Sequence, residues 1–288
     1  MNSEYYSGAT SGPYATTNTN DLPDDFKYSV KVISCEPEVR LKFQRKVYSI
    51  LIIQLLITFL YSLAVLNLPY LQNFMVNHRG IFILSTIISL VTCIWLSFAP
   101  NSNTEDDDIS QSFMPNTGDS TLLQHRNSKP WYHLASKKAQ FTVLMIFTFA
   151  EAYSMSIVTL TYDSKTILSA LLITLVVVVG VTVSSLSPLF QVSMNSLTSV
   201  YYWLNWALWL MIGVGISTLF FGGMGGFSNL IFGWFGAFVF TIYLFIDTQL
   251  IFRKCYIDDE IKCCMMLYLD IINLFLSILR IMSNSNED

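Results

Sequence analysis

A series of mostly apolar stretches, each long enough to cross a lipid bilayer, constrains this chain more than any other feature. A helical span needs about 20 such residues to cross a hydrocarbon core of about 30 Å. Because lipid offers no hydrogen bonds to the backbone, such stretches must be helical. The sequence therefore predicts an all-α polytopic membrane protein with seven spans, at residues 47–68, 79–99, 139–161, 166–186, 201–221, 229–252 and 263–282.

The composition agrees with this class and excludes others. Charged residues make up 12% of the chain and hydrophobic residues 53%, whereas a soluble domain has about 25% charged residues. The net charge of −4 and the absence of a basic run with interleaved aromatic residues give no case for a nucleic-acid partner. No Gly-rich phosphate loop, Ser/His pair or metal-ligand spacing is present, so we expect no cofactor and no enzymatic activity.

Polar segments divide the chain. Residues 1–46 are predicted to be a cytosolic tail that is largely disordered, because its first half is rich in Ser, Thr, Asn and Gly. The transmembrane domain is expected over residues 47–282, with a solvated insert loop at 100–138 that contains an acidic run. Residues 283–288 form a short C-terminal tail.

The distribution of basic residues orients the spans. Of the 16 Lys and Arg residues, six lie in the N-terminal tail, four near the end of the insert loop and three around residues 253–262. The positive-inside rule therefore places the N-terminus in the cytosol. A complete seventh span would put the C-terminal tail in the lumen. The alternative, six spans and a re-entrant segment, would return it to the cytosol, and the charges do not choose between them.

Three acidic residues lie inside predicted spans: Glu151, Asp247 and Asp270. Such residues are costly in lipid, so they usually face the interior of a bundle and mark an ion or proton pathway. Asp247 lies about five residues before the last cytosolic loop and Asp270 about seven after it, which corresponds to depths of roughly 8 and 10 Å. Two antiparallel helices would therefore hold both carboxyl groups at one level.

Two carboxyl groups at close range in a low dielectric tend to share one proton. When ionised, they offer the hard oxygen ligands that calcium prefers. The pair Asp247 and Asp270 is thus predicted to be a site where protons and calcium ions compete. The assignment of calcium as a ligand of these two residues rests on this chemistry alone.

Other polar residues extend this hypothesis. Asn273, Ser277 and Arg280 follow Asp270 at helical spacing, so they lie on one face of the last helix. We take Asn273 and Ser277, together with the deeper Glu151, as candidates for a pathway. The alternative for Glu151 is a protonated carboxyl group that hydrogen-bonds a neighbouring helix.

The cysteines give no sign of a disulfide framework. Their number is odd, one lies in a span and three lie around the last cytosolic loop. No histidine is near that loop, which argues against zinc, while palmitoylation of a juxtamembrane cysteine is an alternative. The five are Cys35, Cys93, Cys255, Cys263 and Cys264.

Several motifs resemble one known family. The segments 233–237 (GWFGA), 246–251 (IDTQLI) and 267–275 (LYLDIINLF) resemble the signature of the transmembrane Bax inhibitor motif family. Residues 150–153 (AEAY) and the approach to the first span resemble its Lifeguard branch, and the long insert resembles fungal members. The resemblance covers about residues 26–282.

This resemblance implies a seven-helix bundle in which the last helix is central. It also implies a pH-sensitive calcium leak from the endoplasmic reticulum and modulation of programmed cell death and of the unfolded protein response. The paired aspartates of the family fall on Asp247 and Asp270. The partners are then the lipid bilayer, calcium ions, protons and proteins of cell-death or stress pathways; a vacuolar or mitochondrial membrane is the alternative location.

One departure concerns gating. Bacterial relatives place a basic residue near the cytosolic end of the second helix, whereas residues 96–100 (LSFAP) contain none here. We therefore expect the gating charge to come from Arg253 or Lys254.

Two other functional classes remain. A non-conducting adaptor would bind cell-death or stress regulators through its cytosolic segments. An intramembrane aspartyl protease also carries two aspartates on adjacent spans, but it needs a Gly-x-Gly-Asp turn, and here residues 267–269 (LYL) precede Asp270.

Overall fold

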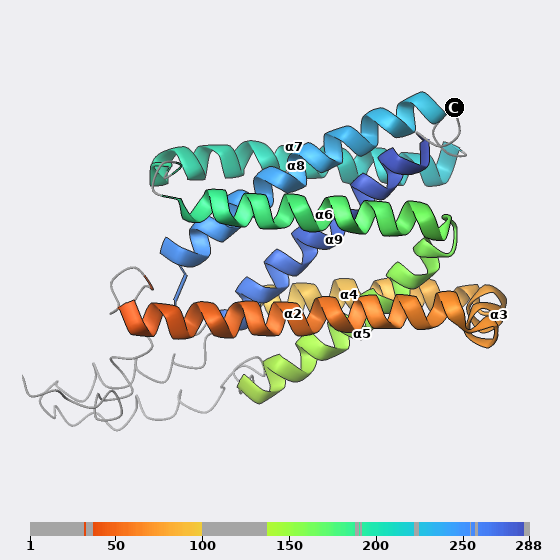
Figure 1. The fold of residues 1–288 in the computed structure, drawn as a ribbon, viewed down its shortest axis with the longest axis horizontal. Coiled ribbons are helices and arrows are strands. Elements are labelled where there is room, and N and C mark those ends of the chain that lie inside the picture. The colour runs from red at the N-terminus through yellow and green to blue at the C-terminus, as the bar shows by residue number, and fades with distance from the viewer. Residues whose placement is uncertain are drawn as a thin grey trace, which may run out of the picture.

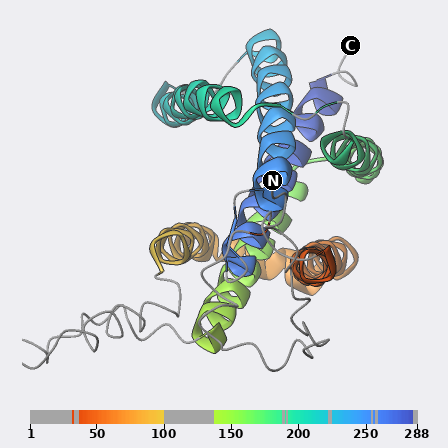
Figure 2. The same ribbon diagram turned by 90° about the vertical axis from the view of Figure 1, so that its left-hand side faces the viewer.

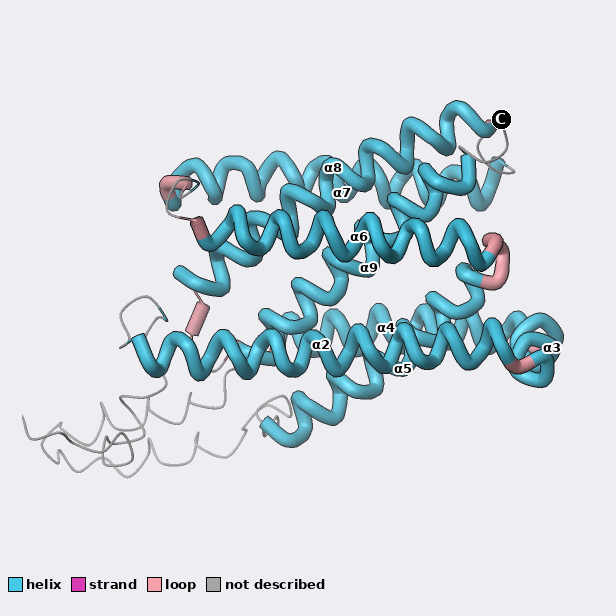
Figure 3. The backbone as a smooth tube through the Cα atoms, viewed as in Figure 1, coloured by secondary structure: helices cyan, strands magenta, loops and turns pink. Residues whose placement is uncertain are grey.

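The structure is a computed structural model, and it describes residues 32, 37–99, 137–187, 190, 192–221, 225–253, 255–256 and 259–284. Most of the predicted tail and of the insert loop lies outside these residues. The described part consists of α-helices joined by short connections (Figure 3). The helices are α2 (Pro37–Asn67), α3 (Pro69–Asn77), α4 (Arg79–Phe98), α5 (Lys137–Thr159), α6 (Ser164–Leu186), α7 (Met194–Phe221), α8 (Gly226–Arg253) and α9 (Glu260–Asn284).

Seven of these helices are long and apolar enough to cross a membrane, which confirms the predicted class. Two features differ from the prediction. Helix α2 begins at Pro37, ten residues before the predicted span, because hydropathy detects only its apolar part while the helix also includes the basic residues that precede that part. The short helix α3 was not predicted, and it begins with Pro69 at its first turn, where the missing N–H costs nothing.

Helix α9 lies at the centre of the bundle. In the end-on view of Figure 2 it stands between α8 and α5, and the other four spans surround this column. In α9, 61% of the residues in the most apolar stretch are buried, against 11–39% in the other six spans. The last helix is therefore central, as predicted. Its 25 residues form one helix (Figure 1) that is long and apolar enough to cross a membrane, which favours a complete seventh span over a re-entrant segment.

The six surrounding spans form two groups of three with the same packing pattern. Helix α5 packs against both α2 and α4, and α8 packs in the same way against both α6 and α7. Because each group has an odd number of spans, the second group runs through the membrane in the opposite direction to the first (Figure 1). Such an arrangement is typical of membrane proteins built from inverted repeats.

Two glycines allow α8 and α9 to approach closely. A Cβ atom added at Gly236 would lie 2.6 Å from Ser277 Oγ, and one added at Gly233 would lie 3.0 Å from Ile281 Cγ1. Small residues at helix contacts are the usual means of close packing in lipid, where no hydrophobic effect drives helices together. This close contact fixes the two helices that carry the aspartates.

Hydrogen bonds between spans hold the other side of α9. Tyr268 of α9 and Thr58 of α2 join through their hydroxyl groups at 2.8 Å. Gln54 Nε2 of α2 donates to Thr148 Oγ1 of α5 at 2.9 Å. Each of these four side chains is buried. Because the bilayer supplies no water to bind them, their hydrogen-bond partners must come from the protein.

Candidate ion- and proton-binding site

Asp247 and Asp270 form a buried pair between α8 and α9. Asp247 lies six residues before the end of α8, and Asp270 lies ten residues after the start of α9. Their exposed fractions are only 3% and 7%. The two carboxyl groups lie within hydrogen-bonding range of each other, an arrangement that is favourable when they share one proton. The structure thus brings together the two aspartates that the depth argument placed at one level.

Among the described residues, the surroundings of the pair contain aromatic hydroxyl groups, and no ion pair reaches either aspartate. Tyr201 of α7 and Tyr243 of α8 pack edge to face, with ring centroids 5.7 Å apart, and both interact electrostatically with the two aspartates. Asp247 Oδ1 and Asp270 Oδ2 are buried and receive no hydrogen bond from a donor in the described residues. None of the ion pairs found in this part of the chain involves either aspartate. This environment suits a pair that shares a proton better than two full charges.

The pair alone is an incomplete calcium site. The described residues contain no cluster of three or more His, Cys, Asp or Glu side chains that could hold a metal ion. Calcium takes about six to eight oxygen ligands, and two carboxylates supply at most four. The pair alone therefore supplies fewer oxygen ligands than a resident calcium ion takes.

The polar stripe of α9 is directed toward α8 and toward its own backbone. Asn273 Nδ2 donates to the carbonyl oxygen of Leu269 at 2.8 Å, and Ser277 Oγ donates to that of Asn273 at 2.8 Å. The Arg280 guanidinium lies 4.7 Å from the centre of the Phe232 ring of α8. The structure gives these groups structural contacts, and a pathway role for Asn273 and Ser277 stays a prediction.

Glu151 belongs to a second polar site, between α4 and α5. Ser89 Oγ of α4 donates to Glu151 Oε2 at 2.5 Å, so Glu151 makes the hydrogen bond to a neighbouring helix that was its structural alternative. Its electrostatic neighbours include Cys93 of α4 and Tyr268 of α9. The structure therefore places Glu151 apart from the immediate surroundings of the aspartate pair.

Arg253, one of the two gating candidates, makes its hydrogen bond away from the aspartates. Arg253 Nη1 donates to the carbonyl oxygen of Val192 at 2.7 Å, in the connection between α6 and α7. Arg253 also lines a cleft between α2, α6 and α8. Lys254 lies outside the described residues. Their gating role stays a prediction without a contact that carries it.

A different set of charges joins the start of α9 to α2 and α5. The buried carboxylate of Glu260, at the start of α9, forms an ion pair with Lys46 of α2 and lies 3.9 Å from Lys137 Nζ of α5. A carboxylate in the first turn also interacts favourably with the helix dipole. Sequence reasoning missed this cluster, because Lys46 and Glu260 are 214 residues apart. The available signal was that all three residues lie at cytosolic ends of predicted spans.

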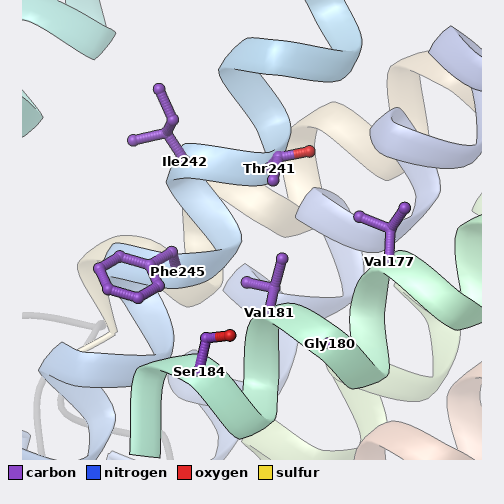
Figure 4. A pocket seen from close by; sticks show the side chains of 7 residues that line it. All are labelled: Val177, Gly180, Val181, Ser184, Thr241, Ile242 and Phe245. Carbon is purple, nitrogen blue, oxygen red and sulfur yellow. The ribbon is translucent and has the colours of Figure 1, made fainter. Parts of the chain in front are cut away.

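An apolar cleft lies between α6 and α8, and Figure 4 shows the residues that line it. Its volume is about 380 Å³. The lining contains no ionisable side chain, since Ser184 and Thr241 are its only polar members. This chemistry suits a lipid chain and gives no binding site for an ion.

The fold and this site define a helical membrane protein with seven spans and a buried carboxyl pair in its last two helices. The profile of the family described as "Inhibitor of apoptosis-promoting Bax1" matches residues 120–287, which is more than half of the chain. The chain therefore belongs to the Bax inhibitor family, which confirms the resemblance of its motifs.

Similar proteins come from fungi, animals and viruses. Bax inhibitor 1 of Saccharomyces cerevisiae is 52% identical over 271 residues, which cover 93% of this chain and 90% of the relative. Protein lifeguard 4 of Mus musculus is 26% identical over 268 residues, which cover 93% and 95%. The Golgi anti-apoptotic protein of vaccinia virus (strain Lister) is 26% identical over 268 residues, which cover 93% and 96%. The name of the first relative refers to inhibition of Bax, and the name of the third describes an anti-apoptotic protein.

Proposed function

We propose that this protein is a pH-sensitive calcium leak channel of an intracellular membrane that modulates programmed cell death and the unfolded protein response. The observation that carries the proposal is the buried pair Asp247 and Asp270, whose carboxyl groups are hydrogen-bonded to each other without a cation among the described residues. The endoplasmic reticulum is the proposed location. One relative carries the Golgi in its name, which supports an endomembrane.

The proposed mechanism follows from the charge of the pair. With one shared proton, the pair carries a single negative charge and holds α8 and α9 together. Loss of this proton leaves two like charges; at about 4 Å and an effective dielectric of about 20 such charges repel by about 4 kcal/mol. This repulsion favours separation of the helices and entry of water, and the two carboxylates then provide oxygen ligands for calcium.

The sign of the pH dependence follows from the absence of a cationic partner. A basic latch on the pair would be released by protonation, so that flux would rise as the pH falls. Here no cation of the described residues contacts the pair, and deprotonation is the step that creates repulsion. We therefore expect calcium flux to increase as the pH rises through the titration of the pair.

The test is calcium release from liposomes that contain the purified full-length protein and a calcium indicator, measured across a range of pH. The wild type should show flux that rises with pH, and Asp247→Asn and Asp270→Asn should each abolish this dependence. The control is Asp163→Asn, which changes an acid outside the pair, at the end of the α5–α6 connection. Gln249→Glu is not suitable as a control because the side chain of Gln249 is buried. Flux with the same pH dependence in both aspartate variants would overturn the assignment of the site.

A second candidate is a membrane adaptor that binds regulators of cell death or stress and conducts nothing. The names of the relatives favour it, since they refer to inhibition of cell death and to no transported ion. The same liposomes distinguish the two. No flux by correctly folded wild type at any pH would refute the channel and leave the adaptor.

A further inference from the structure

Two free thiols meet where α8 ends and α9 begins. Cys255 is close to the end of α8, Cys263 lies in the first turn of α9, and their sulfur atoms are 3.2 Å apart. A disulfide has a sulfur–sulfur distance of about 2.05 Å, so the two atoms are roughly 1.2 Å too far apart to be bonded. A change of roughly 1.2 Å in the separation of the two sulfur atoms would therefore bring them to bonding distance.

The third cysteine of this region is directed elsewhere. Cys264 is buried, and its Sγ donates to the carbonyl oxygen of Val47 in α2 at 3.1 Å. Neighbouring residues on a helix differ in direction by about 100°, which explains why Cys263 and Cys264 face different partners. The chain thus offers a matched control within the same turn.

The backbone around Cys255 is held in place by hydrogen bonds. Its N–H donates to the carbonyl oxygen of Leu250 at 3.1 Å, and its own carbonyl oxygen accepts from the N–H of Val32 at 3.0 Å. The side chain of Cys255 is half-buried, whereas Cys263 is fully buried. An oxidant from solution therefore reaches the Cys255 thiol first, and the Cys263 thiol lies next to it.

We propose that Cys255 and Cys263 form a reversible disulfide in response to hydrogen peroxide. The Cys255 thiolate attacks one peroxide oxygen; a sulfur–oxygen bond forms, the oxygen–oxygen bond breaks, and the departing hydroxide takes up a proton to become water. The Cys263 thiolate then attacks this sulfur and expels the second oxygen as water. In total, two thiols lose two electrons to one peroxide molecule, and a cellular dithiol reverses the reaction by exchange.

The position of the pair agrees with such a modification. The orientation set by the basic residues places this loop in the cytosol, where persistent disulfides are rare and transient ones serve redox sensing. The odd number of cysteines argued against a disulfide framework. A single reversible bond between two neighbouring cysteines does not require one.

The disulfide would act on the aspartate pair, an effect that rests on the proposed function. Cys255 lies eight residues after Asp247, and Cys263 lies seven residues before Asp270. The bond would tie together the cytosolic ends of the two helices that carry the pair, in the arrangement where the carboxyl groups are hydrogen-bonded. Oxidation therefore holds α8 and α9 closed and lowers calcium flux.

The first part of the test is peptide mapping of the full-length protein in liposomes. After treatment with peroxide, free thiols are blocked by alkylation and the protein is digested with trypsin. Cleavage after Lys254, Lys262 and Arg280 separates residues 255–262 from residues 263–280, so the two peptides stay together only through a disulfide. The linked peptide should appear in the wild type and in Cys264→Ser, disappear with a reducing agent, and be absent from Cys263→Ser and Cys255→Ser.

The second part is calcium flux from the same liposomes. Peroxide should lower the flux of the wild type and of Cys264→Ser several-fold, and a reducing agent should restore it, while Cys255→Ser does not respond. A linked peptide that persists in Cys263→Ser, or none in the wild type, would overturn the disulfide. A disulfide without any change in flux would overturn its effect on the helices. No flux in the reduced wild type would contradict the proposed channel, whereas the mapped disulfide would stand.

Discussion

The contact between α8 and α9 at Gly236 gives a sharp prediction. In Gly236→Ala the new Cβ would lie 2.6 Å from Ser277 Oγ and 2.9 Å from Met211 Cε. The methionine can move its flexible end, whereas Ser277 Oγ can turn away only by losing its hydrogen bond to the carbonyl oxygen of Asn273, and Ser277 Cβ would still lie 3.3 Å from the new atom. Overpacking of this kind costs about 1–3 kcal/mol. We expect Gly236→Ala to lower the stability of the bundle by this amount relative to an alanine placed where there is space.

The matched control is Gly213→Ala in α7, because a Cβ there has no atom within 4 Å. Both substitutions gain the same helix propensity of about 0.5–1 kcal/mol, so the difference between them isolates the packing cost. The measurement is the thermal midpoint of unfolding in detergent, which is monitored through the alkylation of buried cysteines as they become accessible. Gly213→Ala should match or exceed the wild type, and Gly236→Ala should fall clearly below it.

A second variant tests the cause. Ser277→Ala removes the oxygen atom at 2.6 Å and leaves Ser277 Cβ at 3.3 Å, a distance that a small shift accommodates. The double variant Gly236→Ala/Ser277→Ala should therefore recover most of the lost stability. Equal midpoints for Gly236→Ala and Gly213→Ala, or no recovery in the double variant, would refute the close contact between α8 and α9.

Two further predictions concern the contacts of α9 with the first group of spans. Glu260→Gln removes the ion pairs to Lys46 and Lys137; because both lysine side chains are substantially exposed, at 56% and 40%, we expect a loss of only about 1 kcal/mol. The thermal midpoint of Glu260→Gln should be below that of the wild type at low salt and close to it at high salt. A midpoint equal to that of the wild type at every salt concentration would show that the cluster is not stabilising. Tyr268→Phe removes the hydroxyl bonded to Thr58 and should cost about 0.6 kcal/mol. A combined variant with Thr58→Val should show less than the sum of the two single losses, whereas full additivity would exclude the bond.

Hydropathy predicted the spans correctly because each residue in lipid must be apolar or paired, a condition that leaves a strong local signal. The depth of Asp247 and Asp270 could also be predicted, since a short connection between antiparallel helices fixes their level. Their mutual contact depends in addition on the rotation of each helix about its axis. That rotation is set by packing at Gly233 and Gly236. It cannot be predicted by counting residues from the end of a span.

The partners of the charges could not be predicted for a related reason. Arg253 was a gating candidate because it is close to Asp247 in sequence, yet its position at the end of α8 directs it to the carbonyl oxygen of Val192. The pair Lys46 and Glu260 joins the first span to the last. Contacts between helices far apart in sequence depend on which helices are neighbours, and only the assembled bundle supplies this order.

Glu151 and Asp247 lie on corresponding helices of the two groups of three. Glu151 lies eight residues before the end of α5, and Asp247 lies six residues before the end of α8, which corresponds to roughly 12 and 9 Å. Since α5 and α8 run in opposite directions, these distances are counted from opposite sides of the membrane, and each acid lies on the third helix of its group.

Helix α9 contacts both third helices and presents a different residue to each. Tyr268 interacts electrostatically with Glu151, while Asp270 is hydrogen-bonded to Asp247. Residues two apart on a helix point about 200° away from each other, so these contacts belong to opposite faces of α9. A rotation or tilt of α9 that opens the aspartate pair must therefore also change the surroundings of Glu151. For the proposed channel, this coupling lets one central helix affect both acidic sites.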